Sequence, residues 1–248
     1  MYCDNIQRYL RRHGLPRIDL KAVLIDMDGV LYDSMRNHTQ AWYRTVSERG
    51  IACTPEEFYL YEGRTGASTI NLFYQRELGR EATEEEIRAM YRRKSELFNA
   101  LPKAEPMPGA ADFLSCLRER GVRPVLVTGS GQDSLLEKLN RDYPGVFVPE
   151  YMVTAFDVKY GKPHPEPYLM GLQKAGVQPG EAVVVENAPL GVQAGTAAGL
   201  FTIGVNTGPL PDEVLLEAGA DLLLHSMREL ADRAGALCGE LGAGTAVR

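Results

Sequence analysis

Residues 21–31 read KAVLIDMDGVL, an apolar run that ends in two aspartates and a glycine. Apolar residues at successive positions are typical of a strand that is buried on both faces of a parallel sheet. Side chains alternate along a strand, so Asp26 and Asp28 project to the same side and converge near its carboxyl end. Ligands of open α/β sheets bind at that end, so the chemistry of this chain is first sought there.

Five further apolar segments follow along the chain. They lie at 124–130, 151–156, 182–187, 201–206 and 221–226. Helical periodicity occupies intervals between them, at 110–120, 133–142 and 166–175. This alternation predicts an α/β fold with a Rossmann-like, doubly wound, mainly parallel sheet.

Residues 34–105 break the alternation. No part of them has the pattern of a strand, and apolar residues recur at helical spacing. A crossover between parallel strands needs far fewer residues, so we expect an inserted helical cap domain here. The core domain is then predicted at 19–33 and 106–235, with terminal extensions at 1–18 and 236–248. We expect the final CGELGAGTAVR to fray, because it lacks apolar periodicity.

The composition is that of an ordinary soluble protein of mildly acidic character. The 248 residues include 27 Lys and Arg against 33 Asp and Glu, which gives a net charge of −6. Nucleic acids and anionic membranes usually bind basic surfaces, so we expect neither as a partner. Four dispersed cysteines predict reduced thiols, and no apolar run reaches the length of a membrane span. We expect a cytoplasmic protein that is a monomer or a weak dimer.

Polar residues follow three more of the predicted strands. Thr128, Gly129 and Ser130 offer hydroxyls and a backbone amide that can cradle phosphate oxygens. Lys162 stands in a Gly-Lys-Pro sequence, and the pair Glu186 and Asn187 ends an apolar segment. Each feature alone has an ordinary explanation as a helix cap, a solvated lysine or a turn. Their coincidence at successive strand ends predicts one shared site.

The segments DMDGVL, VTGS, GKP and ENAPLG resemble the four motifs of the haloacid dehalogenase superfamily. The chain is similar to the branch with a helical cap after the first strand, the β-phosphoglucomutase-like branch. The resemblance covers about residues 19–234. It implies a capped α/β core that transfers phosphoryl groups to and from an aspartate.

The resemblance also implies a role for each motif residue. Asp26 is the nucleophile that accepts the phosphoryl group, and Asp28 is the general acid and base. Thr128 binds the transferring group with Ser130 nearby, and Lys162 bridges the nucleophile and the phosphate. Asp28 has to start protonated to protonate the leaving oxygen, and we expect the neighbouring carboxylate to favour this.

The resemblance further implies Mg²⁺ as cofactor. Its ligands would be Asp26, the backbone carbonyl of Asp28, and Asn187, with Glu186 beside them. The wider family usually has Asp where this chain has Asn187. The neutral amide should weaken Mg²⁺ binding and also reduce the repulsion of a highly charged substrate.

The superfamily offers three reactions for this chain: carbon–halogen cleavage, the β-phosphoglucomutase reaction and hydrolysis of a phosphate compound. Carbon–halogen cleavage needs neither Mg²⁺ nor the second aspartate, so the presence of Asp28 disfavours a dehalogenase. His38 matches a residue of the β-phosphoglucomutases. Those enzymes also carry a Lys and an Arg in the cap loop, where this chain has Glu62 and Gly66. This difference weakens the mutase hypothesis.

The cap loop EGRTGAST is most similar to a subgroup of capped inorganic pyrophosphatases from Bacteroides-type bacteria. That resemblance implies that Glu62 reaches toward the metal site, although a glutamate at a cap rim is also common. Arg64 and Lys94 would then offer positive charge to a second phosphate, unless they are merely solvated. We therefore expect a small phosphorylated substrate, pyrophosphate or a phosphate monoester. An inorganic pyrophosphatase comes first, and a β-phosphoglucomutase or a sugar-phosphate phosphatase is the alternative. A catalytically silent scaffold is the more distant alternative.

Overall fold

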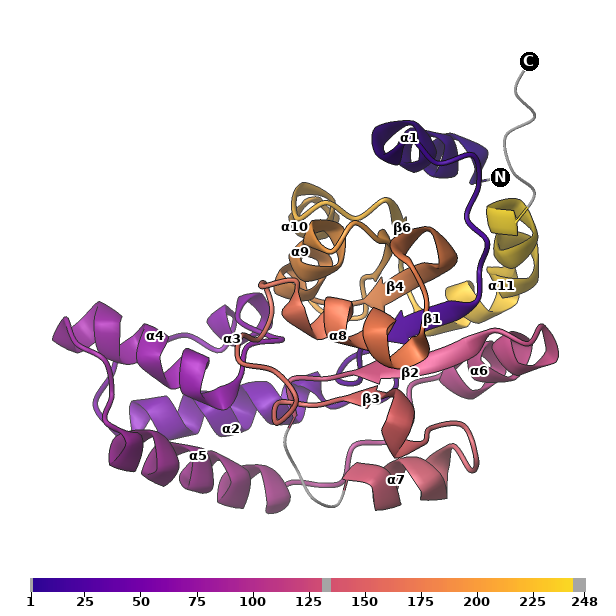
Figure 1. Ribbon diagram of the computed structural model, residues 1–248. Coiled ribbons are helices and arrows are strands. Elements are labelled where there is room, and N and C mark those ends of the chain that lie inside the picture. Colours follow the sequence, from indigo (N-terminus) through magenta and orange to yellow (C-terminus); the bar gives the residue numbers. More distant parts are fainter. Residues whose placement is uncertain (1, 131–134, 243–248) are drawn as a thin grey trace.

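The computed structural model describes residues 2–130 and 135–242. Its centre is a parallel sheet of six strands in the order β3-β2-β1-β4-β5-β6 (Figure 1). The strands are β1 (Ala22–Ile25), β2 (Arg123–Val127), β3 (Met152–Val153), β4 (Ala182–Glu186), β5 (Phe201–Val205) and β6 (Leu222–Leu224). All six predicted strands are therefore confirmed.

The third strand is much shorter than its apolar segment predicts. Asp157 accepts hydrogen bonds from the backbone amide and the hydroxyl of Thr154, both at 2.8 Å. A carboxylate that bonds the backbone in this way favours a turn over a continuing strand. The chain consequently leaves the sheet after Val153.

Helices cover both faces of the sheet, as a doubly wound fold requires. The core helices are α1 (Cys3–His13), α6 (Ala110–Glu119), α7 (Leu135–Asp142), α8 (Glu166–Ala175), α9 (Pro189–Ala197), α10 (Asp212–Glu217) and α11 (Met227–Gly242). Strand β1 shows why two faces are needed. Its Val23 and Ile25 belong to the hydrophobic cluster with α6 and α11, whereas Ala22 and Leu24 belong to the cluster with α8. The first turn expected for α7, near Asp133, lies outside the described residues.

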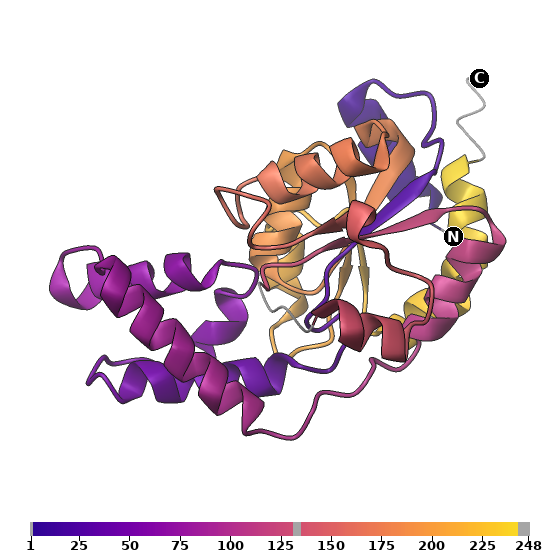
Figure 2. The same cartoon turned by 60° about the horizontal axis from the view of Figure 1, so that its bottom comes forward.

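The insertion after β1 consists of helices, as predicted. They are α2 (Met35–Ser47), α3 (Glu57–Leu60), α4 (Gly66–Leu78) and α5 (Glu84–Asn99). Figure 2 shows them extending from one side of the sheet-bearing core. They enclose a hydrophobic cluster of their own, which contains Phe58, Ile70, Phe73 and Met90. This separate cluster supports a cap domain at 34–105, which we propose together with the predicted core boundaries.

The two connections to the cap are hydrogen bonded to each other. Asp33 N donates to Glu105 O at 3.0 Å, and Met107 N donates to Leu31 O at 2.8 Å. The outgoing and returning chains thus form a short antiparallel pair beside Asp28. Any movement of the cap relative to the core has to bend at this pair.

Helices α1 and α11, near the two ends of the described chain, both pack on the core. Ile6, Tyr9 and Leu10 of α1 are buried in the main hydrophobic cluster, and the Tyr9 hydroxyl donates to Gly199 O at 2.8 Å. Helix α11 continues to Gly242, and only 1% of Leu241 is exposed. The expectation of fraying is therefore wrong as far as Gly242, because α11 packs against α6.

Within residues 2–130 and 135–242, no helix combines the length and the apolar character needed to cross a bilayer.

Candidate active site

The site begins where β1 ends. Asp26 follows directly and is only 5% exposed, and the chain then turns at Gly29, which has a φ of 86°. Glycine is needed there for a second reason. A Cβ at this position would lie 2.0 Å from Nδ2 of Asn187, which follows β4. The turn therefore brings Asp26, Asp28 and Asn187 close together, as the parallel order of β1 and β4 predicts.

Lys162 approaches Asp26 from the loop that precedes α8. Its Nζ donates to Asp26 Oδ1 and to Glu186 Oε1, the latter at 2.6 Å. Burial raises the pKa of Asp26 above its ordinary value, and the nearby Lys162 opposes that effect. For Lys162, the attraction of Asp26 and Glu186 outweighs burial and raises its pKa. Lys162 is therefore an ammonium that supports negative charge at Asp26.

Glu186, which the resemblance places beside the metal ligands, makes contacts with hydrogen-bond donors of the protein instead. It is fully buried, and its two oxygens accept hydrogen bonds from Lys162, from the Tyr168 hydroxyl and from two backbone amides. These donors occupy the directions in which a carboxylate binds a cation. The physical reason is its place at the end of β4, where the turn before α9 directs the amides of Asn187 and Ala188 at its carboxylate.

Asp28 lies under the cap and has different neighbours. Its Oδ1 accepts a hydrogen bond from Ser34 Oγ at 2.5 Å and lies 3.1 Å from His38 Nε2. Burial alone would raise the pKa of Asp28, but His38, Ser34 and Lys94 outweigh it and hold the pKa well below its usual range. The neighbouring carboxylate that we expected to favour protonation is not among the groups that dominate the pKa of Asp28 in this structure. Its surroundings favour the ionised form, which can act as a base.

His38 and Lys94 come from the cap helices α2 and α5. Lys94 Nζ lies 2.9 Å from Nδ1 of His38, and only 4% of Lys94 is exposed. An ammonium can only donate, so Nδ1 accepts and Nε2 carries the proton that faces Asp28. Burial and the charge of Lys94 lower the pKa of His38, which agrees with a neutral ring. Burial likewise lowers the pKa of Lys94, to about 8.

Glu62 reaches the site from the loop between α3 and α4. Asn187 Nδ2 donates to Glu62 Oε2 at 3.2 Å. Burial and the charges of Asp26, Glu186 and Asp28 raise the pKa of Glu62 well above its usual value. The cap thus places a carboxyl group against the motif residues of the core, as the resemblance implies.

The segment Thr128 to Ser130, which the sequence predicts to cradle phosphate oxygens, follows β2. Thr128 is 4% exposed, and its Oγ1 accepts a hydrogen bond from Ser130 N at 3.0 Å. A Cβ on Gly129 would lie 3.2 Å from Gly63 O and 3.3 Å from Arg64 O. Cap and core loops therefore meet backbone to backbone at Gly129.

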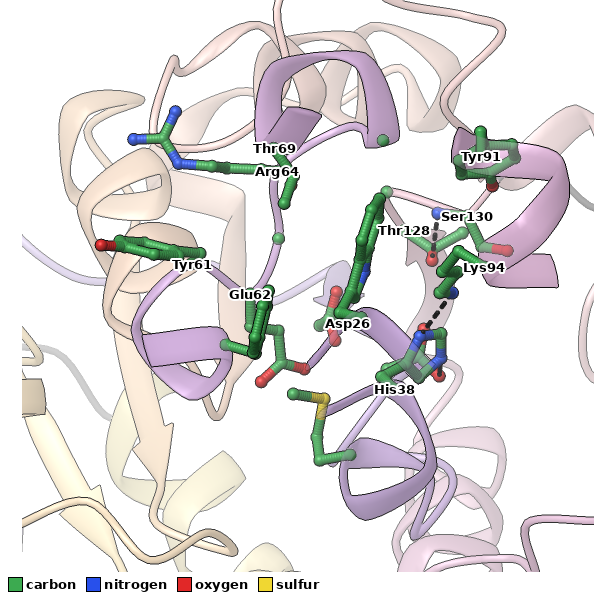
Figure 3. A pocket seen from close by; sticks show the side chains of 17 residues that line it. Asp26, His38, Tyr61, Glu62, Arg64, Thr69, Tyr91, Lys94, Thr128 and Ser130 are labelled. Atoms are coloured by element: carbon green, nitrogen blue, oxygen red, sulfur yellow. Dashed lines mark hydrogen bonds and ion pairs between the residues drawn. The ribbon is translucent and has the colours of Figure 1, made fainter. Parts of the chain in front are cut away.

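Arg64 is placed differently from Lys94 and Glu62. Figure 3 shows its side chain extending away from Asp26, and its Nη1 donates to Ser68 Oγ at 3.0 Å. Lys94 lies closer to Asp28, but its ammonium is engaged by His38. The structure therefore does not direct Arg64 toward a second phosphate beside Asp26.

A cavity of about 80 Å³ lies between the cap and the core. Its floor is formed by Asp26, Asp28 and the segment Thr128 to Ser130. Its cap side is lined mainly by Met35, His38, Trp42, Phe58, Tyr61, Glu62, Arg64, Thr69, Tyr91 and Lys94. The cavity thus has a polar floor, and its cap side carries the aromatic side chains of Trp42, Phe58, Tyr61 and Tyr91 beside charged ones; Figure 3 shows Tyr61 and Tyr91.

The residues present fit a hard divalent cation. Asn187 Oδ1 and Glu62 Oε1 are buried and have no hydrogen-bond partner within the described parts of the chain. Both are oxygens near the Asp26 carboxylate, and Mg²⁺ prefers oxygen ligands. No group of three or more Asp, Glu, His or Cys side chains arranged for a metal occurs in the described ranges. The predicted Mg²⁺ ligands do not form a group of that kind, because they include the side-chain amide of Asn187 and the backbone carbonyl of Asp28.

Sequence reasoning did not single out Ser34 or Tyr168. Ser34 lies at the start of α2, where a serine is usually a helix cap, but its hydroxyl bonds Asp28 instead. Tyr168 lies within the apolar pattern of α8 and gives no separate signal. Both act through contacts that only the fold creates.

Comparisons with known proteins agree with this geometry. Residues 20–199 match the family model of the haloacid dehalogenase-like hydrolases. Hexitol phosphatase A of Escherichia coli is 34% identical over 85% of this chain and 93% of its own. The phosphorylated carbohydrates phosphatase of Thermotoga maritima is 30% identical over 83% and 94%.

A solved structure from Bacteroides vulgatus, which carries a provisional β-phosphoglucomutase name, shows the same architecture. It is 57% identical and superposes with a TM-score of 0.94 over 97% of this chain and 98% of its own. The match thus includes the cap as well as the core. This chain belongs to the haloacid dehalogenase-like hydrolases.

Proposed function

We propose that the chain is a Mg²⁺-dependent phosphohydrolase that works through a phosphorylated Asp26. The observation that carries this proposal is the contact of the buried Lys162 ammonium with the carboxylate of Asp26, which lies at the floor of the cavity between cap and core. A carboxylate is a weak nucleophile toward a phosphate dianion, because like charges repel. A fixed ammonium reduces that repulsion and lets the two groups approach.

The reaction would proceed in two displacements. Asp26 attacks phosphorus and releases the leaving group, and water then attacks the phosphoryl group and regenerates Asp26. Asp28 takes up a proton when the anionic substrate binds, gives it to the oxygen of the leaving group in the first displacement, and takes a proton back from the attacking water in the second; His38 and Ser34 hold its carboxyl group in place. Thr128 and the amides beside it bind the phosphoryl oxygens. Mg²⁺, when bound by Asp26, Asn187 and the Asp28 carbonyl, would neutralise charge on those oxygens.

The relatives favour phosphorylated carbohydrates as substrates over the pyrophosphate that the cap loop predicts. Two of them act, by name, on hexitol phosphates and on phosphorylated carbohydrates. The aromatic side chains on the cap side of the cavity suit the carbon skeleton of a polyol or sugar. The structure also directs Arg64 away from Asp26, so one expected contact for a second phosphate is missing. We therefore place a sugar or polyol phosphate first.

Pyrophosphate remains the second candidate because of Glu62. Its buried carboxyl group faces Asn187 and the aspartates, and occupies space next to the expected phosphoryl site. A carboxylate there favours a metal or water partner over an organic leaving group.

The mutase reaction has less support from the cavity. A Cβ on Gly66 would lie 2.3 Å from the ring of Tyr91, so this ring fills the space that a longer side chain at position 66 would need. The cap loop thus offers no cation at this position. The turnover measurements described next include the mutase reaction as one possible outcome.

Steady-state turnover of pyrophosphate, β-glucose 1-phosphate and a set of hexose and hexitol phosphates decides between these candidates. We expect Mg²⁺-dependent release of phosphate, fastest from a carbohydrate ester and lost in Asp26→Ala. Faster hydrolysis of pyrophosphate, with a selective loss in Glu62→Ala, would select the second candidate. Isomerisation of β-glucose 1-phosphate faster than any hydrolysis would select the mutase. No turnover of any compound would leave a silent scaffold.

A further inference from the structure

The Lys162 ammonium is held by three acceptors. Asp26 Oδ1, Glu186 Oε1 at 2.6 Å and Val127 O at 3.2 Å surround a side chain that is only 2% exposed. An ammonium has three donors, so each of them has a partner. Its place therefore depends on where the partners themselves are fixed.

Glu186 is the partner that most needs fixing. Its Oε2 accepts from the amides of Asn187 at 3.0 Å and Ala188 at 3.2 Å, and its Oε1 is shared by Lys162 and the Tyr168 hydroxyl at 2.8 Å. The amides fix one oxygen from the backbone. The second oxygen, Oε1, is fixed by two side chains alone: the charged Lys162 and the neutral Tyr168.

The space around that carboxylate is closed. A Cβ on Gly191 would lie 1.8 Å from Glu186 Oε1, so helix α9 approaches as closely as a glycine permits. Glu186 has no second position on that side. The remaining freedom is rotation about the bond to its carboxyl group, and a donor to Oε1 limits it.

Tyr168 contacts Lys162 as well as Glu186. Its ring lies beneath the ammonium, with Nζ 5.3 Å from the ring centroid, and the side chain is fully buried. Burial, Glu186 and Asp26 raise the pKa of Tyr168 well above its ordinary value, so the hydroxyl stays a donor. One side chain thus supplies a π face to the cation and a hydrogen bond to the cation's partner.

We propose that Tyr168 is a positioning residue, which holds the Lys162 ammonium against Asp26 by fixing Glu186 Oε1. This inference rests on the proposed function, in which Lys162 screens the approach of Asp26 to phosphorus. Tyr168 touches neither the substrate nor the reacting atoms, so it acts through Lys162 alone.

Tyr168→Phe tests the proposal, because it keeps the ring and removes only the hydroxyl. The expected result is a fall in kcat of about tenfold with a KM within about twofold, since the lost contact orients the transition state more than it binds substrate. Tyr9→Phe is the matched control. Tyr9 is also fully buried and donates at 2.8 Å, to Gly199 O in a different part of the core. It should lose comparable thermal stability and keep its kcat.

A second measurement does not depend on turnover. The Nζ signal of Lys162 in a ¹H–¹⁵N spectrum, identified by its loss in Lys162→Arg, reports how well the ammonium is held. We expect the signal in the wild type and in Tyr9→Phe, and exchange broadening in Tyr168→Phe. A wild type that hydrolyses nothing would overturn the proposed function, whereas the spectra would still test the role of Tyr168.

Combination with Glu186→Gln separates positioning from simple packing. If Tyr168 acts through Glu186, the double variant loses no more kcat than Glu186→Gln alone. Independent, multiplying losses would contradict the proposal. So would a Tyr168→Phe protein with the wild-type kcat and an unchanged Lys162 signal.

Discussion

Nζ of Lys94, in the cap, lies 2.9 Å from Nδ1 of His38, and the opposite nitrogen of that ring lies 3.1 Å from Asp28 in the core. The ammonium donates, so the ring presents a proton to Asp28. This row of contacts from Lys94 through His38 to Asp28 joins the cap to the core only when α2 and α5 lie over the site. We infer that closure of the cap over the core sets the charge state of Asp28, the proposed base, and excludes water.

The first prediction concerns the pH dependence of activity. Burial lowers the pKa of Lys94 to about 8, so the charge that fixes His38 is lost as the pH rises through that value. We expect kcat/KM to decline above about pH 8 in the wild type. Lys94→Met should be about tenfold slower at pH 7 and should lack this decline. The exposed Lys103→Met is the control, and a decline that persists in Lys94→Met would contradict the role of Lys94.

The same lysine predicts a dependence of stability on pH. The pKa of Lys94 is about 8 in the folded chain and 10.5 ordinarily, so the unfolded chain binds more protons between these values. Stability of the wild type relative to Lys94→Met should therefore rise from pH 8 to pH 10.5, by at most about 3 kcal/mol. Urea unfolding at several pH values measures it. Parallel curves for the two proteins would show that Lys94 is not buried as described.

The contact between cap and core loops predicts a steric effect. A Cβ on Gly161 would lie 2.8 Å from Cγ2 of Thr65, so Gly161→Ala should hold the cap away from the core. We expect kcat/KM to fall about tenfold with little change in thermal stability. Thr65→Ser keeps the hydroxyl that caps α4 but removes the methyl group, so it should restore part of the activity. Gly239→Ala, with open space around it, is the control, and an equal loss there would refute the steric explanation.

The unpartnered oxygen of Asn187 predicts its role toward Mg²⁺. Asn187→Leu removes that oxygen at similar volume and should weaken Mg²⁺ binding at least about tenfold, as seen by calorimetry without substrate. Activity should then require more Mg²⁺ and should vanish with EDTA. An unchanged Mg²⁺ affinity would remove Asn187 from the ligand set.

The sheet, and the position of the candidate site residues at one edge of it, were largely predictable from the sequence. Apolar runs long enough for buried strands end at Asp26, Thr128 and Asn187, and a parallel sheet brings such ends to one edge. The charge state of Asp28 was not predictable. It depends on His38 and Lys94, which lie 10 and 66 residues away in the chain and meet Asp28 only after the cap folds.

The roles of Glu186 and Tyr168 were hidden for a similar reason. A carboxylate at a strand end has the same sequence pattern whether it faces a metal or a lysine. What decides between them is the turn between β4 and α9, which supplies two amides, and helix α8, which supplies the hydroxyl. Helix α1 and the end of α11 were underestimated because their apolar positions pack against distant elements.

The central claim is that Asp26 becomes phosphorylated. Rapid acid quench of the enzyme with Mg²⁺ and the fastest substrate, followed by peptide mass spectrometry, measures this most directly. We predict the mass of one phosphoryl group on the peptide that contains Asp26, with a larger fraction in Asp28→Asn, where attack by water is slowed, and none in Asp26→Asn. Turnover of the substrate with no phosphoryl group on that peptide in either the wild type or Asp28→Asn would contradict it.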